Sequence, residues 1–406
     1  MRPCAVCQNP VEPFLSFGRM PIANGFLTEA QFAGEFFFEL MVGFCARCCM
    51  VQLTERVERE KLFHGNYAFF SSTSSFMAGH FQRFAKDVRA RHLAGANPFA
   101  VEIGSNDGIL LQHYARAGIR HLGIEPSGNV ADVARGKGVR TVSEFFDEAL
   151  ARSIVAEHGQ ADAILGANVM CHLSNLHSAV AGIRLLLKPS GVLVFEDPYL
   201  GDIVEKTAYY QIYDEHACYF SLTALDHLFA AHGMEIVDAA PQEVHGGSMR
   251  FTATHNGAHA PAAAVDALRQ RERALGLCET VTFERFRRSV ETSREDLTRL
   301  LRRLKQEGKR VVGYGATSKS TTVTNYCGIT PEFVEFISDT TPIKQGKFSP
   351  GTHIPVRPHA EFAGGPPDYA LLFAWNHGRE IMAKERPYTA SGGKWITYVP
   401  CVQVSG

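Results

Sequence analysis

The chain contains 406 residues, of which 45% are hydrophobic, so it is long enough to form two or three domains with cores of their own. Its 41 Lys and Arg residues balance 42 Asp and Glu residues, which argues against a nucleic-acid partner, because counterion release requires a concentrated positive surface. The N-terminal sequence lacks the apolar segment of a signal peptide, and no run of about 18 apolar residues occurs in the sequence. We therefore expect a cytoplasmic protein without a membrane span, whose ten cysteines are reduced.

Two CxxC pairs stand near the N-terminus: Cys4 with Cys7, and Cys45 with Cys48. Four thiolates form the tetrahedral ligand set of a closed Zn²⁺ site, and in a cytoplasmic protein such spacings indicate metal rather than disulfides. The alternative is two unrelated pairs of reduced cysteines. Cys49 competes with Cys48 as the fourth ligand, but the CxxC spacing favours Cys48. We predict a structural zinc ion that holds a module of residues 1–65 together.

From residue 98 onward, short apolar runs alternate with amphipathic helical stretches. The segment FAVEIGSNDGILLQHYARAG predicts a strand ending at Ile103, a glycine turn, and a helix from about Ile109. Further strands are predicted in HLGIEPS, ADAILGANV and LKPSGVLVFEDP, and a helix from about Leu176 to Leu187. This alternation predicts a mainly parallel, doubly wound α/β sheet, whose ligand lies at the carboxyl ends of the strands.

The first turn of this sheet carries the pattern of a nucleoside site. Gly104 and Gly108 let the backbone approach a ligand closely, and Glu125, seventeen residues after Gly108, is placed to accept hydrogen bonds from ribose hydroxyls. A dinucleotide fold would carry GxGxxG. This chain instead carries E-x-G-x-N-x-G, with Glu102 before the first glycine and Asn106 in the middle.

Together with Asn168 after a later strand and the sequence KPSGVLVFE, this pattern resembles class I S-adenosylmethionine-dependent methyltransferases. The absence of a pyrophosphate cradle fits, because S-adenosylmethionine carries an amino acid and a sulfonium in place of phosphates. NAD binding and a degenerate domain without cofactor are the alternatives. The residues that the resemblance implies at the cofactor are Glu102, Gly104, Asn106, Gly108, Glu125 and Asn168.

The stretch YDEHACYFS, residues 213–221, follows the strand GVLVFEDP and therefore the ligand edge of the sheet. In a helical or turn-like segment, Tyr213 and His216 share a face, and Glu215 is adjacent to orient the imidazole. The unperturbed pKa of histidine, about 6.5, suits proton abstraction near neutrality, which methylation of carbon requires and methylation of a heteroatom does not. Tyr213 or His172 is able to donate to the oxygen of the resulting enolate. The alternative is that His216 satisfies the backbone of a loop.

Residues 263–307 are typical of a charged helical connector, after which RVVGYGATSKSTTVTNYC predicts a strand, a Gly-x-Gly turn and the start of a helix. VEFISD, DYALLFAWN and KWITYVP predict further strands of a second α/β domain. Lys319, close to this helix N-terminus, is a candidate ligand of a nucleotide diphosphate, and a surface lysine is the alternative. Arg250, in HGGSMR, is a second candidate, with an ion pair at the domain boundary as its alternative.

Taken together, these segments resemble the family of nucleotide-sugar C-methyltransferases over nearly the whole chain. The resemblance is carried by CxxC with CxxC followed by VQL, YAFFSSTSSFM, VEIGSNDGILL, QIYDEHACYFS, VHGGSMR, and GYGATSKSTTVTNYC with SDTTPIKQGKFSPGTHIPV. Cys49 and Cys218 stand where we expect other residues. The resemblance implies a zinc-binding module (1–65), a class I Rossmann-like methyltransferase domain (66–260) and a C-terminal α/β Rossmann-like domain (261–406) that contributes to nucleotide-sugar binding.

The substrate of this family is a dTDP- or GDP-linked 4-keto-6-deoxysugar, which is methylated at carbon 3, beside the ketone. The resemblance implies that His216 removes the proton from this carbon, that Tyr213 and Glu215 support it, and that His172 lies near the sugar. The residues implied to contact the nucleotide sugar are Tyr67, Ser72, His245, Arg250 and Lys319.

Two other functions stay open on the sequence alone. The first is methyl transfer to an amine or hydroxyl of a small metabolite, which leaves the YDEH segment without a necessary role. The second is non-catalytic binding of a nucleotide sugar by an inherited methyltransferase fold. The nucleotide carrier, the stereochemistry at carbon 3 and the choice between a monomer and a homodimer are open as well.

Overall fold

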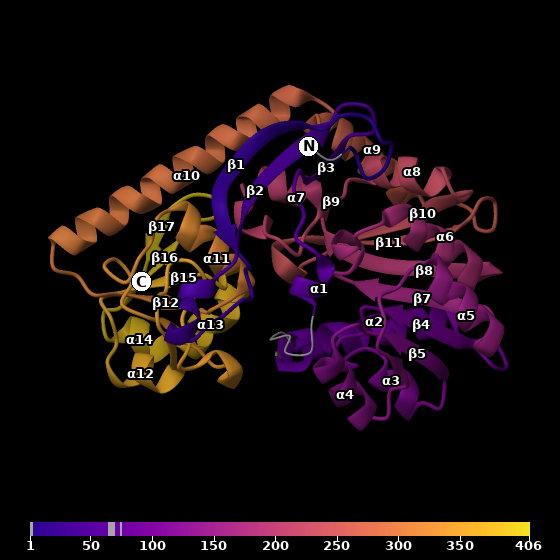
Figure 1. Ribbon diagram of the computed structural model, residues 1–406, viewed down its shortest axis with the longest axis horizontal. Coiled ribbons are helices and arrows are strands. Elements are labelled where there is room, and N and C mark those ends of the chain that lie inside the picture. Colours follow the sequence, from indigo (N-terminus) through magenta and orange to yellow (C-terminus); the bar gives the residue numbers. More distant parts are fainter. Residues whose placement is uncertain (1–2, 64–69, 74) are drawn as a thin grey trace.

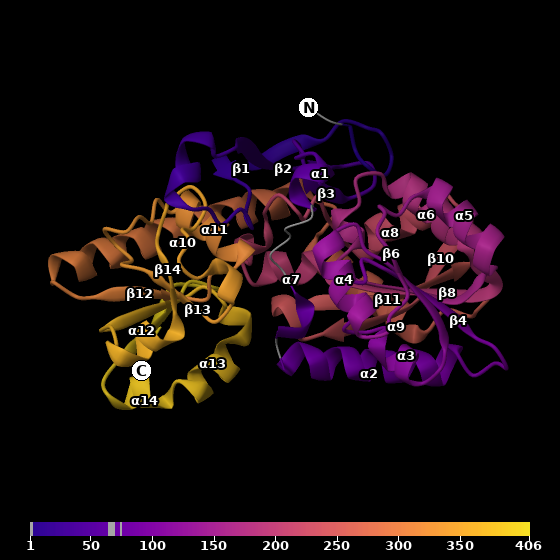
Figure 2. The same cartoon turned by 60° about the horizontal axis from the view of Figure 1, so that its bottom comes forward.

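The structure of the protein is a computed structural model that describes residues 3–63, 70–73 and 75–406. The strands of these residues form a small N-terminal sheet and two larger sheets. Figure 1 shows the two larger sheets next to each other, with β1 and β2 arching across the top of the molecule between them. Figure 2, turned about the horizontal axis, shows the same N-terminal strands above the region where the two larger sheets meet.

The N-terminal sheet has the order β1-β2-β3-β9, and its neighbouring strands are antiparallel. Its fourth strand, β9, comes from the middle of the chain and begins two residues after His216, so the YDEH segment is attached to the sheet that carries the cysteine pairs. The strands are β1 (Glu12–Pro21), β2 (Phe37–Cys45), β3 (Met50–Leu53) and β9 (Cys218–Tyr219).

The middle sheet has the order β10-β11-β8-β7-β4-β5-β6, in which β4 to β8 are parallel and β11 is antiparallel to both neighbours. This order confirms the predicted doubly wound sheet, and it places the topological switch point between β4 and β7. The strands are β4 (Phe99–Ile103), β5 (Arg120–Ile124), β6 (Thr141–Val142), β7 (Ala161–Ala167), β8 (Leu187–Pro198), β10 (Met234–Gln242) and β11 (Ser248–His255).

Helices cover both faces of this sheet because each strand core is apolar on both sides. Residues of α5, α6 and α8 pack in one core cluster, and residues of α2 and α3 pack in another on the opposite face. The helix after β4 begins at Gln112, later than predicted, because turns continue through residue 111. The helices are α2 (Ser75–His92), α3 (Gln112–Arg116), α4 (Gly128–Gly136), α5 (Glu148–His158), α6 (Leu176–Leu186), α7 (Leu200–Glu205), α8 (Leu222–Ala230) and α9 (Ala263–Leu275).

The C-terminal sheet has the order β14-β13-β12-β15-β16-β17, in which all pairs except β16 with β17 are parallel. It is a second Rossmann-like sheet, as predicted, with its switch point between β12 and β15. The strands are β12 (Val311–Tyr314), β13 (Ile337–Asp339), β14 (Val356–Pro358), β15 (Tyr369–Leu372), β16 (Lys394–Thr397) and β17 (Gln403–Ser405). The helices around this sheet are α11 (Ser318–Tyr326), α12 (His359–Gly364), α13 (Gly378–Lys384) and α14 (Arg386–Ala390). The short helix α1 (Arg59–Leu62) lies near the N-terminus.

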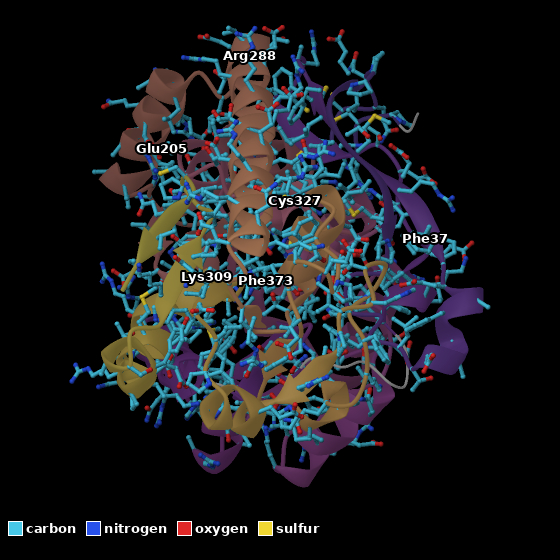
Figure 3. All side chains as sticks on the ribbon, turned by 90° about the vertical axis from the view of Figure 1, so that its left-hand side faces the viewer. Phe37, Glu205, Arg288, Lys309, Cys327 and Phe373 are labelled. Carbon is cyan, nitrogen blue, oxygen red and sulfur yellow. A yellow bond between two sulfur atoms is a disulfide. The ribbon has the colours of Figure 1, made fainter. Side chains whose placement is uncertain are left out.

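The predicted charged connector is the helix α10 (Thr280–Gln306), which runs along the upper left side of the molecule, beside the C-terminal sheet (Figure 1). Its apolar residues, among them Phe286 and Leu297, pack into a core shared with β1, β2 and the C-terminal sheet. Figure 3 shows Arg288 near one end of α10 and Cys327 beside the helix. The boundaries at residues 65 and 260 stay predictions, because β9 and this shared core tie the three parts together.

The prediction that all ten cysteines are reduced is wrong for Cys49 and Cys278, which form a disulfide with a Cα–Cα distance of 4.9 Å. The pairing joins the residue after Cys48 to the segment before α10. It was not recognisable from spacing, because 229 residues separate the two cysteines. The bond also removes Cys49 from the competition for a metal. Among the helices of the described residues, none has both the length and the apolar character required to cross a bilayer.

Candidate active site

A cavity of about 590 Å³ lies at the carboxyl ends of the parallel strands of both larger sheets. The turns after β4, β5, β6 and β7 contribute to its wall from the middle sheet, and the turns after β12 and β13 contribute from the C-terminal sheet. Tyr213, Glu215 and His216 line the same cavity. Asn24 and Arg59 add side chains from the N-terminal part. All predicted cofactor residues except Gly108, all predicted proton-transfer residues, and two predicted substrate residues, His245 and Lys319, therefore line this cavity.

Glycine is required at two positions of the turn after β4. Gly104 has φ of 67°, and a Cβ there would lie 2.7 Å from Val169; Gly108 has φ of 75°, and a Cβ there would lie 2.9 Å from Val139. Both positions combine a left-handed backbone with close packing, which a larger residue cannot adopt without strain. Gly104 lines the cavity, whereas Gly108 packs against Val139 and Ala134. Glycine at position 104 therefore bears on the cavity wall, and glycine at position 108 bears on packing within the chain.

Glu125 follows β5 and holds the turn after β4 in place. Its Oε2 accepts a hydrogen bond from the backbone N–H of Asn106 at 3.0 Å, and its Oε1 accepts one from the N–H of Ser127 at 2.8 Å. Burial raises the pKa of Glu125, and these N–H groups oppose the shift. Each carboxylate oxygen keeps a further lone pair for a ligand hydroxyl.

Two other cavity residues carry buried polar atoms without a hydrogen-bond partner in the described chain. Glu102 is 2% exposed and its Oε2 lacks a partner; burial, followed by the charges of Asp107 and Glu125, raises its pKa well above the usual range. Asn168, with φ of 50°, donates through Nδ2 to His245 Nε2 at 2.5 Å, while its Oδ1 lacks a partner. Such atoms at the switch point fit a polar ligand that supplies the missing hydrogen bonds.

His216 is buried, and both of its ring nitrogens have partners. Nδ1 lies 2.8 Å from the carbonyl oxygen of Gln211, which can only accept, so Nδ1 carries the proton and Nε2 is the acceptor of the neutral ring. Nε2 receives the hydroxyl of Tyr213 at 2.9 Å. Burial, followed by the nearby His172 and Lys319, holds the pKa of His216 well below its ordinary value. The imidazole is therefore a free base at neutral pH.

His172 stacks on His216 with ring centroids 5.2 Å apart. It also stacks on Phe63, with ring centroids 5.6 Å apart. Its Nε2 is buried without a hydrogen-bond partner among the described atoms, and burial lowers its pKa to about 4. The structure thus brings the two predicted histidines together as neutral rings.

The YDEH segment is fixed by contacts to both flanking parts of the chain. Asp214 Oδ1 accepts from the N–H of Ala23 at 3.0 Å, and Glu215 Oε1 accepts from Asn24 Nδ2 at 2.5 Å. From the other side, Thr322 donates to the carbonyl of Ile212 at 2.8 Å. The group that orients His216 at Nδ1 is the Gln211 carbonyl, and the carboxylate of Glu215 is anchored to the N-terminal part.

Lys319, on the first turn of α11, is 8% exposed and lines the cavity. Burial lowers its pKa to about 7. Its charge contributes to the lowered pKa values of His216, His245 and His377, so these three imidazoles lie within its field. This side of the cavity is electropositive and suits an anion.

Two predicted substrate residues lie elsewhere, and a third lies outside the described residues. Arg250 forms an ion pair with buried Glu196 at 2.8 Å and stands 3.8 Å over the ring of Phe84. Ser72 donates through its backbone N–H to Asp107 at 3.2 Å, beside the turn after β4. Tyr67 lies in the segment 64–69, which the structure does not describe.

The four predicted zinc ligands converge at the edge of the N-terminal sheet. The Sγ atoms of Cys4 and Cys48 are 3.4 Å apart, as are those of Cys7 and Cys45, and all four lie within 4.8 Å of one another. A tetrahedral Zn²⁺ with bonds of about 2.3 Å requires sulfur–sulfur separations of roughly 3.8 Å. The cluster therefore fits the metal with small side-chain adjustments.

Sequence reasoning did not find the cavity residues Asn24, Arg59, Asp339 and Lys344. It also did not find Gln211, whose carbonyl contacts His216. Gln211 acts through its backbone, which no side-chain pattern reveals. Asp339 and Lys344 stand in SDTTPIKQGK, a segment that carried the family resemblance without an assigned role, and Asp339 ends a predicted strand. That strand-end acid was the signal that could have identified it.

Comparisons with known proteins agree with this arrangement. The chain matches a zinc binding domain family over residues 4–63, a methyltransferase domain family over residues 77–239 and the C-methyltransferase C-terminal domain family over residues 243–400. It is 34% identical over 400 residues to the C-methyltransferase NovU of Streptomyces niveus, covering 98% of this chain and 95% of NovU.

Two solved structures resemble part of the chain. Magnesium protoporphyrin IX methyltransferase of Synechocystis, with bound S-adenosylhomocysteine, is 14% identical and covers 44% of this chain and 83% of its own, with a TM-score of 0.35. A SAM-dependent methyltransferase of Archaeoglobus fulgidus is 15% identical and covers 41% and 71%, with a TM-score of 0.34. The match to NovU, in contrast, extends over nearly the whole chain.

Proposed function

This chain belongs to the C-methyltransferases, and we propose that it methylates carbon 3 of a dTDP- or GDP-linked 4-keto-6-deoxysugar. Its cofactor is S-adenosylmethionine, and its four-cysteine cluster binds zinc. The observation that carries the proposal is that the turn after β4, the YDEH segment and the turn before α11 line the same cavity. A methyl donor, a base and an anionic substrate can therefore meet there.

Carbon methylation beside a ketone requires removal of a proton, and we assign this step to His216. Its neutral ring has Nδ1 protonated and Nε2 available as the acceptor. The hydroxyl of Tyr213 lies 2.9 Å from Nε2 and covers it. When the sugar binds, rotation of this hydroxyl toward the ketone oxygen frees Nε2 to take the proton from carbon 3 and provides a donor for the developing enolate.

The neutral state of the neighbouring groups supports this assignment. His172 is uncharged and has a buried ring nitrogen without a partner among the described atoms, so it is a second candidate donor to the sugar. Asp214 has its pKa raised to about 8 by burial and by the charge of Glu215, so it is protonated at neutral pH. The charge of Lys319 favours the enolate over the neutral ketone.

Bound S-adenosylmethionine supplies an electrophilic methyl group on a sulfonium. We assign its ribose to Glu125 and the rest of its polar contacts to Glu102, Asn106 and Asn168, which surround the switch point of the middle sheet. Gly104 permits the close approach of the turn. These residues bind and orient the cofactor and have no part in proton transfer.

The anionic part of the substrate is assigned to Lys319, at the N-terminus of α11, with His245 and His377 nearby. The roles of Ser72 and Tyr67 over the nucleotide stay predictions. The role of Arg250 in substrate binding also stays a prediction, and its ion pair with Glu196 offers the structural alternative.

The test follows deuterium incorporation at carbon 3 of the dTDP- and GDP-linked 4-keto-6-deoxysugars in D₂O with S-adenosylhomocysteine present, which blocks transfer. Wild type should catalyse exchange, and His216→Ala should lose about 10²–10⁴-fold of the rate. His259→Ala, at an exposed site on the surface, is the matched control and should retain the rate.

If neither ketosugar exchanges although S-adenosylhomocysteine binds, the substrate class or the carbon-acid mechanism is wrong. If both enzymes exchange equally, His216 is not the base. Either outcome would favour methyl transfer to an amine or hydroxyl of a small metabolite, because that reaction needs no base at this position.

A further inference from the structure

A second group of metal-binding side chains lies at the wall of the cavity. Cys171 and His172 belong to the short 3₁₀ turn Met170–His172 that follows β7, and His216 belongs to the YDEH segment. The sulfur of Cys171 and a ring nitrogen of each histidine all lie within 4.8 Å of one another, and the four zinc cysteines meet the same limit. Within the described part of the chain, these are the two groups of three or more cysteine, histidine or carboxylate side chains that come this close.

Both histidines can offer a lone pair to a cation. Nε2 of His172 is buried and has no hydrogen-bond partner among the described atoms. In His216, Nδ1 donates to the Gln211 carbonyl, so Nε2 carries the lone pair and has only to release the hydroxyl of Tyr213. Both rings line the cavity, so a dissolved ion can reach them.

A thiol and a carboxylate accompany the two rings. Cys171 is 2% exposed, and its sulfur gives up a proton to solvent when it binds a metal. Asp197 is 1% exposed, and both of its carboxylate oxygens lack a hydrogen-bond partner among the described atoms. Burial, followed by the charge of Asp197, raises the pKa of Cys171 well above its ordinary value, so this carboxylate lies close to the sulfur. One thiolate and one carboxylate balance the two charges of a buried divalent cation.

The dimensions and the donor types of this group suit a transition metal. With Zn–S bonds of about 2.3 Å and Zn–N bonds of about 2.0–2.1 Å, tetrahedral ligands lie roughly 3.3–3.6 Å apart, so the three donors have to close by at most about 1.5 Å. A thiolate with two imidazoles favours Zn²⁺, Co²⁺ and Cu²⁺ over Mg²⁺ and Ca²⁺. Three protein ligands leave the fourth position of a tetrahedral ion open for water.

We propose that Cys171, His172 and His216 form a second metal site, which binds a thiophilic divalent transition metal and inhibits the enzyme when it is filled. The ion bonds to the nitrogen that we assign to proton abstraction, so the ion and the proton of carbon 3 compete for the same lone pair. The inhibition rests on the proposed function, whereas the binding does not. The site is weaker than the four-cysteine cluster, because it offers one thiolate instead of four and because the charge of Lys319 acts against a cation at His216.

The experiment starts from the full chain with its four-cysteine cluster filled by zinc, to which Zn²⁺ or Co²⁺ is added. A second equivalent of metal should bind, measured as metal content after removal of the free ion. Added Co²⁺ should also give the near-ultraviolet absorption of a cobalt–thiolate bond. Saturating Zn²⁺ should slow deuterium exchange at carbon 3 by about 10²–10⁴-fold, as expected when the base is blocked. A chelator too weak to empty the four-cysteine cluster should restore the rate, and Mg²⁺ should have no effect.

Cys171→Ala tests the site directly, because Cys171 has no part in the proposed reaction. This variant should keep the metal-free exchange rate, lose the cobalt–thiolate absorption and require at least about tenfold more Zn²⁺ for half inhibition. Cys327→Ala, at a buried free cysteine at the end of α11, is the matched control and should respond to metals as wild type does. Asp197→Asn removes the charge beside the sulfur and should weaken metal binding by about 10–100-fold.

The outcomes separate this inference from the proposed function. Failure of a second equivalent to bind, equal inhibition of wild type and Cys171→Ala, or faster exchange with added metal would each overturn the second site as proposed. If Cys171→Ala does not fold, the metal affinity of Asp197→Asn decides the case. If metal-free wild type exchanges no ketosugar, the proposed function fails, while the metal content and the cobalt absorption still decide whether the site exists.

Discussion

The hydroxyl of Tyr213 lies 2.9 Å from Nε2 of His216, on the ring nitrogen opposite the one that donates to the Gln211 carbonyl. Tyr213 thus caps the lone pair that we assign to proton abstraction. A single rotation of the hydroxyl changes its partner from the base to the substrate.

Replacing Tyr213 by Phe should therefore slow deuterium exchange at carbon 3 by about 10²-fold, because the donor to the enolate oxygen is lost. Binding of S-adenosylhomocysteine should not change. Exchange by Tyr213→Phe at the wild-type rate would assign the enolate donor to another group, with His172 as the next candidate.

The lowered pKa of His216 has a consequence for the pH profile. Because burial keeps the imidazole neutral down to pH values well below 6.5, the base form is complete throughout the neutral range. Exchange should stay constant between pH 8 and pH 6.5 at saturating substrate and fall only at lower pH. An acidic limb with its midpoint at or above 6.5 would contradict this protonation state.

Lys319 should make nucleotide binding weaker as the pH rises above 7. Its pKa of about 7 means that the cation is present below pH 7 and lost above it, while an anion in the cavity raises that pKa again. At pH 8, binding of dTDP or GDP should therefore be weaker than at pH 6 and should take up a proton, measurable by calorimetry in buffers of different ionisation enthalpy. Lys319→Met should remove both effects, and exposed Lys309→Met should retain them.

Zinc loss should affect catalysis through the N-terminal sheet. β3 pairs with β9, and the N–H of Leu53 donates to the carbonyl of Ala217, next to His216, at 3.0 Å. Cys7→Ser should lower the zinc content, the Tm and the exchange rate together, and should reduce S-adenosylhomocysteine affinity much less. Exposed Cys401→Ser is the control. Full exchange activity in a zinc-free protein would show that the active site does not depend on the metal.

Substitution of Arg250 distinguishes a structural role, through its ion pair with Glu196, from a role in substrate binding. Arg250→Met leaves Glu196, 2% exposed, without its guanidinium partner and should lower the free energy of unfolding by about 3 kcal/mol. The double variant with Glu196→Gln should recover part of that loss, and the KM for the nucleotide sugar is measured in both variants. A rise in KM without a loss of stability would favour the role in substrate binding.

Much of the candidate site was predictable because its signals are local. The two CxxC spacings, the glycine turn with Glu125 one strand later, and the composition of YDEHACYFS each lie within a short stretch of chain. The periodic alternation of strands and helices also predicted the doubly wound middle sheet, and the later strand and helix patterns predicted a second α/β domain. The late start of α3 was missed, because the turns that follow Gly108 delay the helix.

Other features depend on residues that are far apart in sequence. The Cys49–Cys278 disulfide spans 229 residues, and the pairing of Arg250 with Glu196 depends on the antiparallel register of β11 against β8. The orientation of His216 by a backbone carbonyl left no trace in side-chain patterns.

The sequence by itself determined the types of chemistry that the chain can perform: four thiolates for zinc, a nucleoside turn, and a histidine with donors beside it. Only the tertiary structure decided that these groups meet in a cavity, which protonation state burial imposes on His216 and Lys319, and which charges are already paired. The reason is that spacing along the chain sets local conformation. Desolvation and long-range pairing arise only when the sheets pack together.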